Sequence, residues 1–208
     1  MGIAEKVLSH FSTNGTLPYY FKESNHVKTL IFNGSPRLRG DTMSLINSII
    51  PKIEGEVKIV NVCTSKIAPC IDCRYCWSHA GCAFIDEMQN VYNYIRDCDN
   101  IIIASPIYFG ELTGQLLSVG SRLQTYFCAR HFRKEVPIEK PKKGAVLLVS
   151  GSNTDMTKAF GTASTLLTEM NCTDILDPVM FKSTGEGRPL ESEGASDKLA
   201  KLVEFINA

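Results

Sequence analysis

The chain has 208 residues, which is enough for one domain with a full hydrophobic core. Hydrophobic residues make up 44% of the sequence, as in a folded globular protein and unlike a disordered chain. The 22 basic and 22 acidic residues balance, so no overall charge attracts nucleic acid or an anionic membrane, and we expect neither partner.

The first 26 residues are interpreted as an N-terminal extension to a domain that covers residues 27–208. Residues 4–11 are predicted to form a short helix, and the aromatic run 17–21 suits packing on a surface. The N-terminus has no signal-peptide core, and the longest near-apolar run, 101–109, is too short to cross a bilayer. We therefore expect a cytoplasmic protein without a membrane-spanning segment.

Residues 27–45 are predicted to form a strand, a loop and a helix that begins near Thr42. The free amides and dipole at the helix start suit an anion, and further donors and charge come from Ser35, Thr42, Ser44, Arg37 and Arg39. The loop lacks the Walker lysine and the G-x-G-x-x-G spacing, which favours a single phosphate monoester over a triphosphate or a pyrophosphate. A plain turn before a helix capped by Asp41 or Thr42 is the alternative.

Four more predicted strands follow, and helices alternate with them. The strands are predicted at 56–62, 100–104, 144–149 and 173–181, and the helices at 42–50, 86–97, 112–127, 156–170 and 198–206. Five strands that alternate with helices predict an α/β fold with a doubly wound five-stranded parallel sheet. The loops 33–42, 105–110 and 150–155 each follow a strand directly, so we expect them to meet beyond the carboxyl ends of the strands.

Four cysteines lie close together in the segment 70–82, separated by two, two and five residues: Cys70, Cys73, Cys76 and Cys82. A [4Fe–4S] cluster needs four thiolates that converge from a wrapped loop, and the C-x-x-C-x-x-C part matches the run in bacterial ferredoxins. Zinc is a second interpretation, although structural zinc sites usually present two separated C-x-x-C pairs. Cysteines without metal, as thiols or a redox disulfide, are a third.

The other four cysteines are scattered, and we expect them to be buried as small apolar side chains: Cys63, Cys98, Cys128 and Cys172. No catalytic triad is recognisable. The segment Ser150–Ser152 is not a nucleophile elbow, and none of the four histidines has a recognisable catalytic partner.

The loop 33–42, followed by Ser105–Gly110, resembles the corresponding loops of flavodoxin-like NAD(P)H-dependent FMN reductases, and within that group the chain is most similar to iron-sulfur flavoproteins. The resemblance covers residues 27 to about 155. It implies that the FMN phosphate is held by Ser35, Arg37, Thr42, Met43 and Ser44. It implies that the ribityl chain and one edge of the isoalloxazine ring are lined by Ser105, Pro106, Ile107, Tyr108 and Gly110, and that Ser150, Gly151 and Ser152 stand near the other edge. Asp41 replaces the usual Asn of the family and is left out of the phosphate set.

The cysteine spacing also resembles the motif that binds a [4Fe–4S] cluster in iron-sulfur flavoproteins. The resemblance implies an FMN-dependent oxidoreductase that moves electrons between NAD(P)H or a ferredoxin-type carrier and an acceptor. It further implies a homodimer or homotetramer. The flavin itself carries hydride or single electrons, so no side chain is predicted to be catalytic.

Two other functions remain open. Without a cluster, the chain is an NAD(P)H-dependent flavin or quinone reductase. With zinc in the cysteine loop and a degenerate flavin pocket, it is a non-enzymatic metal-binding or regulatory module. The basic run 130–134, with Lys140, Lys142 and Lys143 after it, is interpreted as a solvated face, and a contact for NAD(P)H phosphates or an acidic carrier is the alternative.

Overall fold

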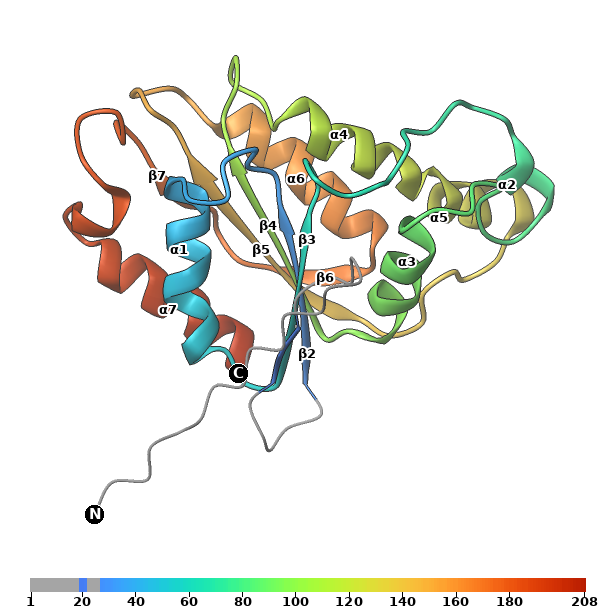
Figure 1. Ribbon diagram of the computed structural model, residues 1–208. Helices are drawn as coiled ribbons and strands as arrows, with labels where there is room; N and C mark the ends of the chain where they lie inside the picture. The colour runs from blue at the N-terminus through green and yellow to red at the C-terminus, as the bar shows by residue number, and fades with distance from the viewer. Residues whose placement is uncertain (1–18, 22–26) are drawn as a thin grey trace.

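A computed structural model describes residues 19–21 and 27–208 (Figure 1). The strands are β1 (Tyr19–Phe21), β2 (Lys28–Asn33), β3 (Glu56–Asn61), β4 (Asn100–Pro106), β5 (Lys142–Val149), β6 (Cys172–Ile175) and β7 (Val179–Phe181). The α-helices are α1 (Asp41–Ile49), α2 (Tyr75–Ser78), α3 (Met88–Asp97), α4 (Gly114–Gly120), α5 (Gln124–Cys128), α6 (Thr157–Glu169) and α7 (Ala195–Asn207). Short 3-10 or π-helical turns are η1 (Ile50–Lys52), η2 (Ser121–Leu123), η3 (Ala129–Arg133) and η4 (Pro189–Glu191). The helix predicted at 4–11 lies outside the described residues.

A single sheet has the strand order β1-β3-β2-β4-β5-β6, and β7 also pairs with β5. Every pairing between β2 and its neighbours, and onward to β6 and β7, is parallel, whereas β1 joins the β3 edge in antiparallel orientation. The order starts at β2, steps outward to β3, and then reverses direction to β4 and β5. This reversal is the switch point of a doubly wound sheet. The predicted parallel sheet and its flavodoxin-like winding are confirmed.

The fifth predicted strand, 173–181, is present as two pieces with a gap between them. β6 pairs with the beginning of β5 and β7 pairs with its end. Pro178 lies in the gap. Proline has no amide hydrogen for the ladder, which explains why the strand is interrupted there.

Helices cover both faces of the sheet (Figure 1): α1 and α7 lie on one face, and α3, α4, α5 and α6 lie on the other. Alternate residues of each central strand enter different cores, so Leu30 packs on the second face and Ile31 on the first. β4 divides in the same way, with Ile103 in one core and Ile102 in the other. The continuous apolar runs of the sequence, such as that of β4, are therefore strands that are buried on both faces.

The helical segment after β4 extends beyond the predicted end at residue 127. It runs from Gly114 through η2 and α5 into the π-helical turn η3, which ends at Arg133. The helical segment continues through Gly120. A Cβ at this position would lie 3.0 Å from Leu166 Cδ1 of α6. The glycine thus allows close packing between two helices. Within the described residues, no helix is long and apolar enough to span a membrane.

Gly55, at the start of β3, gives a direct test of this fold. Its φ is +81°, and a Cβ on it would overlap the Val27 carbonyl, which accepts the Glu56 N–H at 2.9 Å. We expect Gly55→Ala to destabilise the protein by about 3 kcal/mol, because the backbone must change conformation and the carbonyl must move. Gly187→Ala, where nothing lies within 4 Å of the added Cβ, is the matched control. Equal urea-unfolding free energies for the two variants would contradict this reading.

Candidate functional site

Three loops meet at the carboxyl ends of β2, β4 and β5, which are consecutive in the sheet. The amide of Gly34, just after β2, donates to the Ala104 carbonyl of β4 at 2.8 Å. The amide of Ile107, just after β4, donates to the Val149 carbonyl of β5 at 2.8 Å. The prediction that the loops 33–42, 105–110 and 150–155 come together is therefore confirmed.

The first loop is shaped by Asn33, the last residue of β2. Its side chain is fully buried, donates to Asn61 Oδ1 at 2.8 Å, and accepts the Ser35 N–H at 3.0 Å. Helix α1 then begins after Gly40 without a side-chain N-cap, and Asp41 is its first residue. The alternative in which Asp41 or Thr42 caps the helix is therefore wrong. The amides of the first turn are left without a side-chain acceptor, a feature typical of an anion-binding helix start.

The first and second loops are held together by a clamp that consists of Gly34, Ser105 and Thr113. Thr113 Oγ1 donates to the Gly34 carbonyl at 2.9 Å, and it also accepts from the Leu116 N–H as the N-cap of α4. A Cβ on Gly34 would lie 2.9 Å from Ser105 Oγ. Glycine is needed here because the two loops approach each other so closely.

Thr113 is a residue whose replacement should loosen the clamp without changing side-chain shape. We expect Thr113→Val to lower the free energy of unfolding by about 1–2 kcal/mol, because it leaves a buried carbonyl unpaired and removes an N-cap. Thr165→Val removes a hydroxyl that donates to the Gly161 carbonyl on the exposed face of α6. It should change the free energy of unfolding by less than about 0.5 kcal/mol. Chemical denaturation of both variants measures the difference. Equal losses would show that the clamp has no special role.

The predicted flavin residues surround this junction, and they differ in exposure. Four are buried: Ser35, Thr42, Ser105 and Ser150. Five are half-buried: Met43, Ser44, Pro106, Ile107 and Gly110. Four are exposed: Arg37, Tyr108, Gly151 and Ser152. Ser105 Oγ donates to the Pro106 carbonyl and accepts from the Thr113 amide, so this hydroxyl shapes its own loop.

The second loop forms a small hairpin that projects from the carboxyl end of the sheet (Figure 1). Tyr108 and Glu111 pair across it through two backbone hydrogen bonds of 2.9 and 3.0 Å. Phe109 and Gly110 at its tip have φ of 54° and 75°. Tyr108 and the tip residue Phe109 both present their rings to solvent. The hairpin therefore offers aromatic surface beside the loop junction.

The cysteine loop, residues 70–82, lies between β3 and α3 and is fastened along its length. The Cys70 amide donates to Ser121 Oγ at 3.0 Å, and Thr125 Oγ1 donates to the Gly81 carbonyl at 2.8 Å. The Arg133 guanidinium donates to the Cys76 carbonyl. Three fixed points on one helical segment therefore define the path of the loop.

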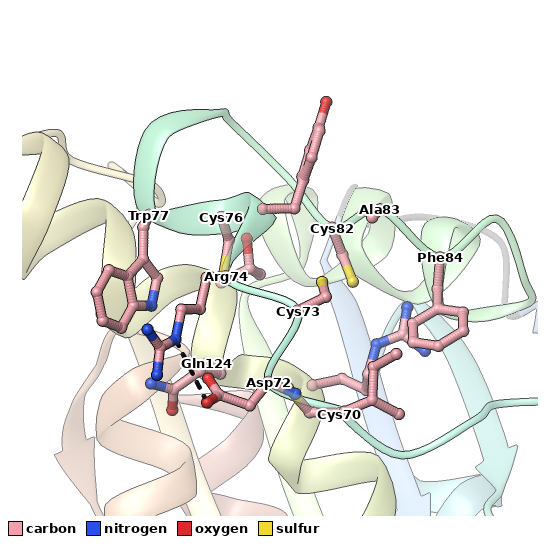
Figure 2. Close-up of a pocket in the computed structure, with 14 residues that line it drawn as sticks. Cys70, Asp72, Cys73, Arg74, Cys76, Trp77, Cys82, Ala83, Phe84 and Gln124 are labelled. Atoms are coloured by element: carbon pink, nitrogen blue, oxygen red, sulfur yellow. Dashed lines mark hydrogen bonds and ion pairs between the residues drawn. The ribbon is translucent and has the colours of Figure 1, made fainter.

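All four cysteines of the loop line one pocket. Figure 2 shows Cys73, Cys76 and Cys82 directed from the loop toward the space that it encloses. Burial, followed by the contact with the neighbouring Cys128 thiol, raises the pKa of Cys76 to about 12. All eight cysteines of the chain are free thiols.

The fit of a metal group to this pocket rests on its donors. Four thiols on one loop are the soft donor set that iron–sulfur clusters and zinc take. Within residues 19–21 and 27–208, however, no group of three or more His, Cys, Asp or Glu side chains is arranged to hold a metal ion. The donor chemistry suits a cluster, and the cluster itself stays a prediction.

Aromatic side chains frame the loop on its solvent side. Trp77 stacks on Phe132 of the π-helical turn with ring centroids 4.4 Å apart, and the Arg74 guanidinium lies 4.9 Å from the Trp77 ring. His79 stacks on Tyr75 at 4.5 Å. These contacts give the short helix α2 a packed outer face although none of its residues is buried.

Two expectations about side chains outside the loop need correction. Cys98, Cys128 and Cys172 are buried as predicted, but Cys63 is only half-buried, and its thiol lies 3.6 Å from the Gly34 carbonyl. Cys63 therefore contacts the first loop, 33–42. Cys63 follows the end of β3, at the same edge of the sheet as that loop. The predicted strand 56–62 ends directly before Cys63, so the sequence already indicated this position.

The basic segment is not one solvated face. Arg130 pairs with Glu169, and Arg133 pairs with Glu135 at 2.9 Å. Lys142 is only 3% exposed and donates to the carbonyls of Arg96, Cys98 and Lys140. Burial lowers the pKa of Lys142. The predicted solvated face is wrong for Lys142, which is buried against the Cys98 carbonyl at the end of α3, and for Arg133, whose guanidinium also donates to the Cys76 carbonyl of the cysteine loop.

The sequence reading missed three residues that build the site: Asn33, Thr113 and Arg122. Thr113, followed by a helical pattern, has the signature of an N-cap and was open to prediction. Asn33 is the first residue of the predicted loop 33–42. Its hydrogen bond to Asn61 depends on the pairing of β2 with β3, which the local sequence does not report. Arg122 lies in an amphipathic helical segment, where nothing in the local pattern marks a buried charge.

The winding of the sheet and the loop junction at its switch point define a class, the flavodoxin-like α/β proteins. The sequence profile of the NADPH-dependent FMN reductases matches residues 27–186, and the chain belongs to that family. The family consists of flavin-dependent oxidoreductases, so the predicted family and its enzyme class are confirmed.

Among its relatives are iron-sulfur flavoproteins. One from Methanocaldococcus jannaschii is 31% identical over 129 residues, covering 60% of this chain and 62% of the relative. A second from the same organism is 32% identical over 93 residues, covering 43% of this chain and 48% of the relative. One from Methanosarcina thermophila is 31% identical over 123 residues, covering 58% of this chain and 61% of the relative. The chain thus spans about half to three fifths of the length of these relatives.

Solved structures support the fold. The NAD(P)H:quinone oxidoreductase from Methanothermobacter marburgensis has a TM-score of 0.62 at 12% identity, covering 86% of this chain and 94% of that chain. RosB with a bound riboflavin-5'-phosphate derivative has a TM-score of 0.64 at 18% identity, covering 87% of this chain and 77% of that chain. At these identities the similarity establishes the flavodoxin-like architecture.

Proposed function

We propose that this protein is an FMN-dependent oxidoreductase of the iron-sulfur flavoprotein type, which transfers electrons between a reduced donor and an acceptor. The observation that carries the proposal is the meeting of three loops at the switch point of the sheet, on the edge where doubly wound folds bind nucleotides. Membership in the NADPH-dependent FMN reductase family supports FMN as the nucleotide.

In this proposal the phosphate of FMN lies at the start of α1. The uncapped amides of the first turn, the Thr42 hydroxyl and the exposed Arg37 guanidinium supply donors and positive charge, and the Ser35 hydroxyl, which donates to the Arg37 carbonyl, shapes the loop around them. The Ser44 hydroxyl donates to the Asp41 carbonyl at 2.8 Å, which fixes the geometry of that first turn. These residues bind and orient the phosphate, and we assign them no proton transfer.

The ring of the flavin lies, in the proposal, between the second and third loops. The segment Pro106–Gly110 offers the exposed Tyr108 ring, and on the opposite side the third loop offers the exposed Gly151 backbone and the exposed Ser152 side chain, while the Ser150 amide is held by the Phe181 carbonyl. When bound, the flavin supplies hydride or single-electron chemistry. The protein's own contribution is to hold the ring, exclude water from one face of it, and donate hydrogen bonds to its polar edge.

The cysteine loop is proposed to hold a [4Fe–4S] cluster through Cys70, Cys73, Cys76 and Cys82. Support comes from the shared pocket, the four free thiols and the iron-sulfur flavoprotein relatives. Such a group supplies single-electron transfer when bound. The loop residues coordinate it, and the fixed points at Ser121 and Thr125 set the loop path.

Partners and assembly complete the proposal. NAD(P)H or a ferredoxin-type protein is the electron carrier, and the chain acts in the cytoplasm as a homodimer or homotetramer. Several large apolar side chains are strongly exposed, which supports contact with another protein surface. They are Ile71, Ile85, Phe109 and Val136. Free thiols throughout the chain accord with a reducing compartment.

A second candidate function is a cluster-free NAD(P)H-dependent flavin or quinone reductase. It is favoured by the absence, within the described residues, of a ready arrangement of metal-binding side chains. The zinc-binding module shares the same thiols but gives the loop junction no role. We therefore rank it third.

Anaerobic purification separates the three functions. The proposal predicts one FMN per chain together with iron and acid-labile sulfide, seen as flavin absorption bands above a broad iron–sulfur shoulder. Flavin without iron would establish the cluster-free reductase. A colourless protein that contains zinc and does not take up added FMN would contradict the proposal.

A further inference from the structure

A buried positive charge lies beneath the cysteine loop. Arg122 of η2 has a side chain that is 0% exposed, and it is among the residues that line the pocket of the four cysteines. Its guanidinium carbon lies 5.0 Å from the Phe84 ring, just after the last cysteine of the loop. A charge buried this deeply is costly unless it has partners, so its surroundings indicate its role.

Asp86 is the ionic partner of Arg122. Arg122 Nη1 lies 2.6 Å from Asp86 Oδ2, and Nη2 lies 3.3 Å from Oδ1. Burial alone would raise the pKa of Asp86, but the hydrogen bonds from Arg122 and from the Ala68 and Met88 amides lower it below its usual value. The carboxylate is therefore ionised at neutral pH, and the pair is fully charged.

The same pair ties together the two ends of the cysteine loop. Arg122 Nη1 donates to the Ala68 carbonyl at 2.8 Å, and Asp86 accepts from the Ala68 amide at 3.1 Å. Asp86 also accepts from the Met88 amide at 3.0 Å, at the start of α3. Residue 68 precedes the first cysteine, and residue 86 follows the last. The ion pair therefore holds both ends of the loop, through its two hydrogen bonds to Ala68 and through Asp86 itself.

The positive end of the pair faces the thiols. Arg122 lines the pocket, whereas Asp86 is not part of that lining. Arg122 Nε has no hydrogen-bond partner among the described residues, although it is buried. The other charged side chains of the pocket, Asp72 and Arg74, pair with each other at 3.7 Å and are largely exposed. Arg122 is thus the buried charged side chain of the cysteine pocket, and its counter-charge, Asp86, lies outside the pocket lining. Figure 2 shows Cys73, Cys82 and Phe84 around the same pocket.

We propose that Arg122 is a positioning and charge-compensating residue for the group held by Cys70, Cys73, Cys76 and Cys82, and that its guanidinium raises the reduction potential of that group. This inference rests on the proposed [4Fe–4S] cluster. A cluster with four thiolates carries negative charge, and one-electron reduction adds one more negative charge. A fixed positive charge that is itself buried beneath the pocket stabilises the reduced form more than the oxidised form.

The charge hypothesis makes opposite predictions for the two partners of the ion pair. Arg122→Gln removes the positive charge, so the ratio of reduced to oxidised cluster at the wild-type midpoint potential should fall about tenfold, a shift of about 59 mV to lower potential for a one-electron couple. Asp86→Asn removes the negative charge and should shift the midpoint to higher potential. Arg122→Lys keeps the charge and should remain near the wild-type value.

A purely structural role predicts a different pattern, because both Arg122→Gln and Asp86→Asn break the same tie. Both would then shift the midpoint in the same direction or leave it unchanged, and either result overturns the proposal. Hydrogen exchange of residues 68–86 should increase in both variants, which confirms that the tie was broken. If Arg122→Gln does not fold, the other two variants carry the test. The midpoint potential of Asp86→Asn should then lie above the wild-type value, and that of Arg122→Lys should lie near it.

The experiment is a potentiometric titration of anaerobically reconstituted holoprotein, followed by electron paramagnetic resonance of the reduced cluster. Iron and acid-labile sulfide are measured first in the wild type. A wild-type chain without iron would fail at that step and would overturn the cluster proposal together with this inference. Wild-type protein with a full cluster, but with midpoints that do not separate in sign, would overturn only the role of Arg122.

Discussion

The variant Cys73→Ala is expected to lose its iron and to keep its FMN. Cys73 is exposed, so its removal costs little packing, whereas a cluster on four thiolates loses one quarter of its ligands. We expect the iron content after anaerobic reconstitution to fall by about tenfold or more, because ligand number and metal affinity are directly linked. The loop junction proposed to hold FMN is made of other residues. One FMN per chain should therefore remain.

The matched control is Cys172→Ala, which removes a buried thiol outside the cysteine loop. This variant should retain its iron and sulfide and lose about 1 kcal/mol of stability from the small cavity left behind. Iron, sulfide and flavin are quantified in the same preparations. Equal iron contents in Cys73→Ala and the wild type would remove Cys73 from the ligand set. Parallel loss of iron and FMN would show that the two sites are not independent.

The variant Arg37→Gln is expected to bind FMN about 10- to 100-fold more weakly, which corresponds to the 1.5–3 kcal/mol of a charge-assisted hydrogen bond. Arg37 is exposed, and its Nε lies 3.6 Å from the position that a Cβ on Gly40 would take, at the beginning of α1. The guanidinium thus stands over the uncapped helix start. Riboflavin, which has no phosphate, should bind the wild type and this variant equally.

Arg39→Gln is the control for general electrostatics, since Arg39 is also exposed and adds charge to the same loop but is not among the residues that the family resemblance assigns to the phosphate. We expect its FMN affinity to stay within about threefold of the wild type, as for a surface charge that is screened by solvent. Fluorescence titration of the wild type and of both variants, with FMN and with riboflavin, measures all six affinities. Weaker riboflavin binding by Arg37→Gln would indicate a damaged fold and not a lost phosphate contact.

The fold was predictable where local patterns are decisive. The apolar runs that became β4 and β5 are strands buried on both faces, and the run of small and polar residues after β2 became a loop in front of α1. Because parallel strands bring their carboxyl ends to one edge, three separate loops in the sequence predicted one junction.

Other features depend on contacts between distant residues, and no local pattern reports them. Residues 19–21 pair with β3 as the edge strand β1, and Pro178 divides the last strand because of its place beside β5. The partner of Lys142 is a set of carbonyls at a helix end that only the folded chain assembles. Arg122 is likewise invisible in sequence, since its charge is stabilised by Asp86 from another element.

The most direct test of the central claim is hydrogen exchange of the protein with and without FMN. We expect slower exchange at the amides of residues 35–44, 105–110 and 150–152 when FMN is added. We expect no change at the end of α7, where the Ile206 carbonyl accepts from Asn100 at the amino end of β4, away from these loops. Protection confined to other segments, or none at the three loops despite saturating FMN, would contradict the claim that the loop junction holds the flavin.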